Sequence, residues 1–269
     1  MIPALLLAVT AAAGAPTEAP DMAWRVVARG VTYATITLAP QPSVGDGRLH
    51  VVKIDPAKAR LRAFAVSQVG GAARTARQWR EELRLVAVIN AGMYDVDYSK
   101  HTGYFRLGDH INSSRWVKSY QSILLLDPRK PGLPRAAIHD AGDSTPDDYE
   151  TVVQNLRLIR APGTSVWAEN GRRWSEAAVA MDGDGAILFL FSRSPYSMHE
   201  LNRILLALPL GIVRAMHVEG GPEASLSVRG GGIDLSLSGS FETRFNENDR
   251  NLHQWPLPNV LGIEAEPAP

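Results

Sequence analysis

The sequence contains no cysteine among its 269 residues. Disulfide bonds, thiolate nucleophiles and zinc sites built from cysteine are therefore excluded. The charges also cancel, because 28 lysine and arginine residues balance 28 aspartate and glutamate residues. Without a net charge the protein has no overall field that attracts nucleic acid or an anionic membrane, so we expect neither as a partner.

Long apolar runs are missing after the first 20 residues, and no later stretch reaches the roughly 18 apolar residues that a membrane helix needs. The start, "MIPALLLAVTAAAGAPTEAP", has an apolar run over 2–9 followed by small residues. This order is typical of a secretory signal peptide, with a plain apolar tail as the alternative. We therefore expect a signal peptide over 1–15, a secreted or periplasmic protein, and no stable membrane insertion after cleavage.

Motifs for well-known cofactor and nucleophile chemistry are also missing. The seven histidines show no spacing typical of zinc ligands, and no glycine-rich nucleotide motif occurs. Ser225 does not lie in the Gly-x-Ser-x-Gly context of a serine hydrolase. We expect no metal and no cofactor.

What the sequence does contain is a series of short strand-like runs rich in Val, Ile, Leu and Thr. In 177–192, two apolar stretches flank Asp-Gly-Asp-Gly, a strong signal for a hairpin turn. Only two segments favour helices. Residues 73–84 place apolar side chains on one face, and 197–208 combine that spacing with a capping box formed by Ser197 and Glu200.

These elements predict an α+β fold, with mixed or antiparallel sheets and a few packed helices in a single domain. Residues 16–44 would form an N-terminal segment with the first strands, 45–263 the main domain, and 264–269 a tail. The polar, proline-rich stretch 128–148 is interpreted as a surface insertion, because strand-like runs flank it on both sides.

The first place for chemistry is 88–111, where a strand ends at Asn90 and leads into a loop that contains Gly92, Tyr94 and Gly103. Aromatic rings mixed with hydrogen-bonding groups suit carbohydrate, which has apolar ring faces and hydroxyl edges. A large turn with a capping asparagine and exposed aromatics is the alternative.

A second place combines a strand-like run over 152–159, which contains Gln154, with the arginine pair Arg172-Arg173 before a later strand. The planar fork of an arginine matches carboxylate or phosphate oxygens. Taken alone, a solvated surface pair is the simpler interpretation.

The third place is the segment "VEGGPEAS", where Glu219 and Glu223 flank Gly220 and Gly221 at the end of an apolar strand. Glycines let the backbone approach a ligand closely, and their N–H groups can hold an anion. A plain Gly-Gly-Pro turn explains the same residues, so this pattern alone leaves both interpretations open.

Taken in this order, the three segments resemble the phosphodiester glycosidase family, and most closely its short bacterial exported branch, over roughly 45–263. The motifs are Asn90-Ala91-Gly92-Met93-Tyr94, Thr102-Gly103-Tyr104-Phe105, the Gln154 strand, Arg172-Arg173-Trp174 with the following hairpin, and Glu219-Gly220-Gly221-Pro222-Glu223-Ala224-Ser225. Two departures stand out. The Gly-Pro that the family carries after the glutamine is absent, and Glu219 stands where relatives usually carry aspartate.

The resemblance implies hydrolysis of a sugar-1-phosphodiester, or of a related glycosidic bond in an envelope or extracellular glycan. A phosphomonoester leaves readily, so such a site needs a carboxylate near the anomeric carbon and positive or N–H groups around the phosphate. The implied catalytic residues are Glu219 as the carboxylate, Arg173 as the phosphate holder, and Asn90. The implied substrate-binding residues are Gly92, Tyr94, Gly103, Gln154, Gly220, Gly221, Glu223 and Ser225.

Two other functions stay open at this point. A non-catalytic glycan-binding or envelope-scaffold protein on the same fold would tolerate both departures. A metal-dependent phosphoesterase would use Asp95, Asp97 and a histidine, although their spacing lacks the EF-hand pattern. Aromatic residues make up only 7% of the chain, which favours a compact site for one or two sugars.

Overall fold

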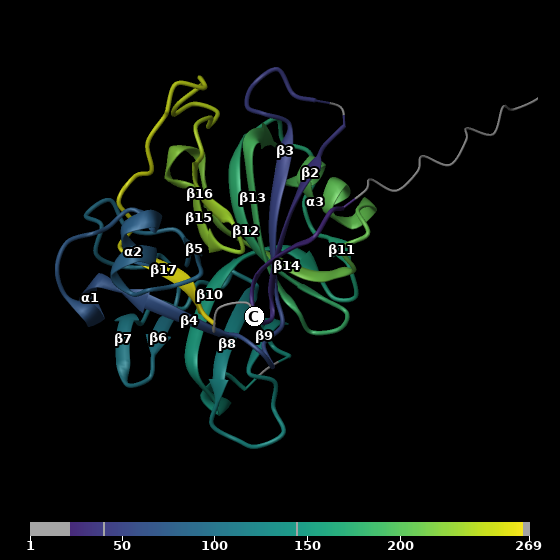
Figure 1. Cartoon of the computed structure of the whole chain (residues 1–269). Helices are drawn as coiled ribbons and strands as arrows, with labels where there is room; N and C mark the ends of the chain where they lie inside the picture. Colours follow the sequence, from purple (N-terminus) through teal and green to yellow (C-terminus); the bar gives the residue numbers. More distant parts are fainter. Residues whose placement is uncertain (1–21, 40, 144, 266–269) are drawn as a thin grey trace, which may run out of the picture.

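The computed structural model describes residues 22–39, 41–143 and 145–265 (Figure 1). Strands dominate these residues, which form seventeen strands and three α-helices. Every strand pair is antiparallel. The α+β prediction therefore holds only in part, because the fold is mainly antiparallel sheet. The signal peptide predicted over 1–15 lies outside the described residues.

The larger sheet has twelve strands. Its main path is β1 (Arg25–Ala28), β2 (Val31–Thr37), β3 (Arg48–Ile54), β13 (Ile187–Tyr196), β12 (Trp174–Asp182), β14 (Ile212–Gly220), β10 (Tyr149–Arg160), β6 (Phe105–Leu107) and β7 (His110–Ser113). Three strands pair off this path, namely β8 (Ser122–Pro128), β9 (Ala136–Asp140) and β11 (Thr164–Ser165). The central position of β12, β14 and β10 places the second and third predicted site segments in the middle of this sheet.

Two predictions about this sheet have clear outcomes. The hairpin between β12 and β13 is confirmed, and Asp182 Oδ1 accepts the backbone N–H groups of Asp184 at 3.0 Å and Ala186 at 2.9 Å. The stretch 128–148, interpreted as a surface insertion, contains β9 in its middle, which pairs with β8 over five residues. Apolar side chains at the start of β9 pack against the core, which outweighs the surrounding prolines and glycines.

The smaller sheet has five strands in the order β16 (Ile233–Ser238), β15 (Ser225–Gly230), β5 (Ala87–Asn90), β17 (Asn259–Glu264) and β4 (Arg60–Ala65). β17 pairs with both β4 and β5. Its last residue, Glu264, falls in the stretch that the sequence interpretation treated as a tail.

Both predicted helices are present. They are α2 (Ala76–Glu82) and α3 (Met198–Ala207), and each begins with a capping box, formed by Thr75 with Gln78 and by Ser197 with Glu200. The structure adds the short helix α1 (Val66–Val69) and two 3-10 turns, η1 (Pro146–Asp148) and η2 (Gly221–Glu223). None of the helices in the described part of the chain has the length and apolar character needed to cross a membrane.

The molecule is built in four layers. Alternate side chains of a strand point to opposite faces, so Val179 and Phe189 pack between the sheets while Ala178 and Leu188 pack under α3. On the far side of the smaller sheet, Trp79 of α2 packs on apolar side chains of β4, β5 and β17. Figure 1 shows this arrangement, with α2 beside the smaller sheet and α3 beside the larger one.

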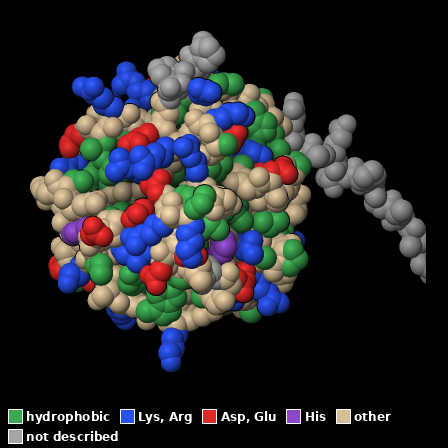
Figure 2. Space-filling model, turned by 90° about the horizontal axis from the view of Figure 1, so that it is seen from below, with side chains coloured by type: hydrophobic (Ala, Val, Ile, Leu, Met, Phe, Trp, Pro, Cys, Tyr) green, Lys and Arg blue, Asp and Glu red, His purple; other side chains and the backbone are tan. Residues whose placement is uncertain are grey.

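The surface carries both signs of charge. On the face seen in Figure 2, acidic and basic side chains lie interspersed among polar and apolar ones. This distribution agrees with the balanced charge of the sequence, so any excess of one sign has to be found locally.

Candidate active site

The turn after β14 meets the end of β5, which joins the first and third predicted segments. Asn90 Nδ2 donates to the carbonyl oxygen of Glu223 at 3.0 Å, and Asn90 Oδ1 accepts the N–H of Ser225 at 2.8 Å. Asn90 is 1% exposed, and both polar atoms of its side chain are engaged. It therefore holds the turn in place, and its role toward a sugar hydroxyl stays a prediction.

A β-bulge in β14 sets the direction of the Glu219 side chain. Glu219 opposes Ala177 and His217 opposes Ala178, so Val218 has no partner on β12. Opposed residues of antiparallel strands share a face. Glu219 therefore faces the space between the sheets with Ala177, while His217 faces the α3 side with Ala178. Without the bulge, His217 and Glu219 would point the same way.

The two glycines after Glu219 are needed because protein atoms crowd them. A Cβ atom on Gly220 would lie 2.7 Å from Cδ1 of Trp174. Gly221 has φ +62°, and a Cβ atom there would meet the Glu242 carboxylate. The N–H of Gly220 donates to Glu219 Oε1 at 3.1 Å. The glycines therefore let the backbone approach Trp174 and Glu242, where a ligand was expected. The N–H of Gly220, which was expected to bind an anion, already donates to Glu219.

Three carboxyl groups gather at this turn, from Glu219, Glu223 and Glu242, and we call them the carboxyl cluster. Burial raises the pKa of Glu219 to about 8, and the neighbouring Glu223 and Glu242 add to this rise while His217 opposes it. Burial also raises the pKa of Glu223 to about 7, with a further contribution from Glu242. One of the two carboxyls therefore keeps its proton near neutral pH, which is the state that acid–base catalysis needs.

Behind the cluster lies a buried pair that the sequence interpretation missed. His217 Nδ1 and Glu176 Oε1 are 2.6 Å apart, and Trp174 Nε1 donates to Glu176 Oε2 at 2.6 Å. Burial disfavours the imidazolium, yet the Glu176 carboxylate beside it raises the pKa of His217 above its usual value. A signal was available, since a histidine and a glutamate inside apolar strands are unusual unless they are paired.

Tyr94 lies next to the carboxyl cluster. Burial raises the pKa of its phenol, and Glu219 and Glu223 raise it further. The Tyr94 hydroxyl is buried and has no hydrogen-bond partner among the described residues. Its ring contacts Tyr98, with the ring centroids 5.2 Å apart. Of the predicted substrate-binding residues, Tyr94 and Glu223 each have a buried side-chain oxygen that is left for a ligand, since Glu223 Oε2 also has no partner among the described residues.

The middle predicted segment is occupied by contacts within the protein. Gln154 is fully buried, its Nε2 donates to the carbonyl oxygens of Val117 and Tyr120, and its Oε1 accepts the N–H groups of Val117 and Tyr104. Gly92 and Gly103 let the loop pass close to β10, since a Cβ atom on Gly92 would meet His101 and Asn155, and one on Gly103 would lie 2.6 Å from the Gln154 carbonyl oxygen. Ser225 is buried, and its hydroxyl donates to the Glu223 carbonyl. These residues shape the loop and the turn.

The side chain of Arg173 pairs with α3 and, among the described residues, makes no hydrogen bond or ion pair with the carboxyl cluster. Its Nη2 lies 2.7 Å from Glu200 Oε1 on α3, and the backbone N–H donates to Thr243 Oγ1 at 3.0 Å. The guanidinium is therefore engaged on the α3 side of the larger sheet. Its role as a phosphate holder stays a prediction, and the geometry offers it no support.

The candidate metal ligands Asp95 and Asp97 lie on an exposed turn, where Asp97 accepts hydrogen bonds from Ser99. Burial lowers the pKa of the nearby His101 to about 4. Within the described ranges no group of three or more histidine, aspartate or glutamate side chains is arranged to hold a metal ion.

Comparison with known proteins places this geometry in a family. The model for the phosphodiester glycosidase family matches residues 84–264, which include both Asn90 and the turn after β14. The chain is similar to the catalytic domain of zebrafish N-acetylglucosamine-1-phosphodiester alpha-N-acetylglucosaminidase, with a TM-score of 0.57 and 12% identity over 91% of this chain and 88% of that one. A search of the curated proteins found no match.

A hypothetical protein from Synechocystis has the same fold, with a TM-score of 0.58 and 15% identity. The similarity covers 91% of this chain but 64% of that protein, so the chain spans less than two thirds of its length. At such identities the solved structures show the fold alone, whereas the family model covers more than half of the chain. The protein therefore belongs to the phosphodiester glycosidase family.

Proposed function

We propose that the protein is a glycoside hydrolase that acts through Glu219 and Glu223. The observation that supports this most is the pair of carboxyls on one turn with pKa values raised to about 8 and about 7. Most glycosidases use two carboxyl groups, one to protonate the leaving oxygen and one to activate water or attack the sugar. Membership of a glycosidase family supports the same reaction class.

In the proposed reaction, Glu219 keeps its proton near neutral pH and donates it to the leaving oxygen. Glu223 loses its proton first and acts on the anomeric side as a base or a nucleophile. The unpartnered Tyr94 hydroxyl holds a sugar hydroxyl beside the two carboxyls. Because the two groups interact, the two pKa values belong to the pair.

The sequence resemblance implied either a sugar-1-phosphodiester or a related glycosidic bond as the substrate. We further propose the second of these, a glycoside of an uncharged or amino sugar. Glu219, Glu223 and Glu242 make no ion pair with an arginine or lysine among the described residues, and His217, whose charge acts on Glu219 and Glu242, is already paired with Glu176. Two like charges 4 Å apart repel by about 4 kcal/mol at a protein surface. A phosphodiester anion would face this repulsion from each carboxyl of the cluster that has lost its proton, with Arg173 held by Glu200.

A substrate panel tests this proposal. Purified protein is assayed on neutral nitrophenyl glycosides and short amino-sugar oligosaccharides, and in parallel on N-acetylglucosamine-1-phosphate esters. We expect the best neutral or amino glycoside to exceed the phosphodiesters at least about tenfold in kcat/KM, a difference of roughly 1.4 kcal/mol. Preference for the phosphodiester would refute the substrate class. Saturable glycan binding without any turnover would favour the non-catalytic alternative.

The pH dependence of kcat/KM provides a second prediction. Below about 7 both carboxyls of the pair are protonated and the base is lost, and above about 8 both are ionised and the acid is lost. We therefore expect a narrow bell-shaped profile between these values. The Glu223→Gln variant should lose the acidic limb of any residual activity. An optimum near pH 5 would contradict the assignment.

We also propose that the protein acts outside the cytoplasm on an envelope or extracellular glycan, because its first fifteen residues have the order of a signal peptide. N-terminal sequencing of the protein from its native cell tests this. A start at Met1 in the cell interior would contradict export.

A further inference from the structure

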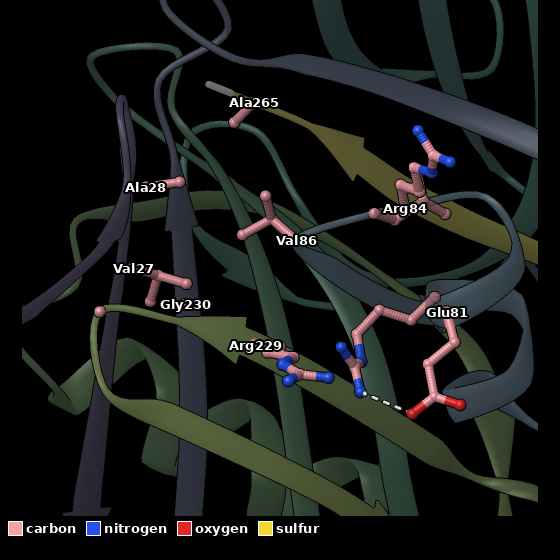
Figure 3. A pocket seen from close by; sticks show the side chains of 11 residues that line it. Val27, Ala28, Glu81, Arg84, Val86, Arg229, Gly230 and Ala265 are labelled. Carbon is pink, nitrogen blue, oxygen red and sulfur yellow. Dashed lines mark hydrogen bonds and ion pairs between the residues drawn. The ribbon is translucent and has the colours of Figure 1, made fainter. Parts of the chain in front are cut away.

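A pocket of about 740 Å³ lies at the opposite end of β15 from the carboxyl cluster. β15 begins at Ser225 beside the turn and ends at Gly230 in the wall of the pocket, so the two places are about 17 Å apart along the strand. The pocket lies between α2, β1 and the end of β15 (Figure 3). None of the residues assigned to the proposed reaction lines it.

One side of this pocket is cationic. Arg80 and Arg229 line it together with the single acid Glu81, and Arg84 lines the pocket with its side chain turned away from them (Figure 3). Arg80 is 3% exposed, its Nε donates to Ser227 Oγ at 2.8 Å, and its Nη2 lies 3.4 Å from Glu81 Oε1. Figure 3 shows Arg229 reaching toward this ion pair, which the dashed line marks.

The acids near the pocket do not balance these arginines. Glu81 is shared with Arg77, whose Nε lies closer to it, at 2.8 Å. Asp234 is the other nearby acid, but it lies 3.6 Å from Arg80 Nη2 and 3.7 Å from Arg229 Nε, beyond good hydrogen-bond distance. Two carboxylates thus serve three guanidinium groups, those of Arg77, Arg80 and Arg229.

The pKa of Arg80 reflects electrostatic repulsion from the neighbouring arginines. Burial lowers its pKa, and the charges of Arg229 and Arg77 lower it further, against the opposing effect of Asp234 and Glu81. An added anion would relieve both the repulsion and the poor solvation of the buried guanidinium. The protein alone leaves this side of the pocket short of negative charge.

Arg84 adds an independent observation. It follows the end of α2 with φ +54°, in the left-handed region where glycine is favoured at this position. Its side chain lines the pocket and makes no hydrogen bond or ion pair among the described residues. An arginine at this position therefore places a positive charge at the pocket, although the backbone conformation favours glycine.

The opposite side of the pocket is apolar. Val27, Ala28, Val86 and Ala265 line it, and Figure 3 shows them across from Arg229 and Glu81. An anion with an apolar part would therefore contact both sides at once. Three arginines at one pocket match the double charge of a phosphate monoester better than the single charge of a carboxylate.

We propose that this pocket binds an organic phosphate monoester, with the phosphate on Arg80 and Arg229, the charge of Arg84 adding to the attraction at the pocket, and the apolar group against Val27 and Val86. Binding here is separate from the proposed hydrolysis. The site would thus take an anion that the carboxyl cluster repels.

Calorimetry with hexyl phosphate as the probe tests this site, beside inorganic phosphate, hexanoate and hexanol. We expect one saturable site for hexyl phosphate, with at least tenfold weaker binding of the other three compounds. Arg229→Ala removes an exposed arginine and should weaken hexyl phosphate binding at least tenfold. Arg172→Ala removes another exposed arginine, outside the pocket, and should leave the affinity unchanged, as should Glu219→Gln.

A second variant separates binding from folding. Arg84→Gly should raise the melting temperature, because glycine accepts positive φ without strain, and should still weaken hexyl phosphate binding several-fold. Unchanged affinity in both Arg229→Ala and Arg84→Gly would overturn the proposal. So would equal binding of hexanol, or absence of saturable binding at millimolar hexyl phosphate.

Discussion

Glu219→Gln is expected to lower kcat/KM on a glycoside substrate by about 10²- to 10⁴-fold, the usual contribution of a general acid or base. Glutamine keeps the shape of the side chain and still accepts the N–H of Gly220, but it cannot supply the proton that Glu219 retains near neutral pH. Steady-state kinetics on the best substrate of the panel measure the loss. The matched control is Glu150→Gln, which removes an exposed carboxylate that pairs with Arg129 and should leave the rate unchanged.

The same variant has a stability signature that excludes unfolding as the cause. A buried carboxyl whose pKa is raised from about 4.5 to about 8 keeps its proton in the folded state while the unfolded state releases it. Stability therefore falls as pH rises from about 4.5 to about 8. Glu219→Gln removes this penalty, so at pH 9 we expect the inactive variant to be more stable than the wild type. A variant that is inactive and also less stable at pH 9 would contradict both assignments.

His217→Ala is expected to destabilise the fold by about 3–5 kcal/mol, because it leaves the Glu176 carboxylate buried without its partner. For a protein of this size we expect a fall in melting temperature of about 10 °C. Denaturant unfolding followed by circular dichroism measures the change. Glu176→Gln is the matched control, since a glutamine can accept from Trp174 Nε1 and donate to a neutral His217, and it should cost far less.

The effect of His217→Ala should also depend on pH. The raised pKa of His217 means that the pair contributes its full stability below about 6.5 and loses it as pH rises through the higher folded value. The difference between wild type and variant should therefore be larger at pH 6 than at pH 9. His217 also opposes the rise in the pKa of Glu219, so in any residual activity the alkaline limb should move to higher pH. A pH-independent loss of stability would show that the imidazole acts only as a packing group.

Local signals in the sequence predicted much of the fold. Apolar spacing located α2, apolar spacing and a capping box located α3, and Asp-Gly-Asp-Gly located the hairpin between β12 and β13. These signals involve groups within four residues of one another, so they act before any distant partner is present. β17 was missed, because its short apolar run forms a strand only when β4 and β5 lie on either side of it.

The candidate site was also predictable from the sequence only in part. Asn90, Tyr94, Glu219 and Glu223 carry their chemistry in their residue types and in their places at strand ends, so the sequence could nominate them. The roles of these residues could be assigned only from their surroundings in the folded chain. Burial raises the two carboxyl pKa values, the unpaired Val218 turns Glu219 toward the space between the sheets, and hydrogen bonds within the protein engage the amides of Asn90 and Gln154. The pairing of Arg173 with Glu200 and of Glu176 with His217 joins residues 27 and 41 positions apart. Such contacts depend on which strands and helices become neighbours, and sequence patterns of a few residues do not encode that choice.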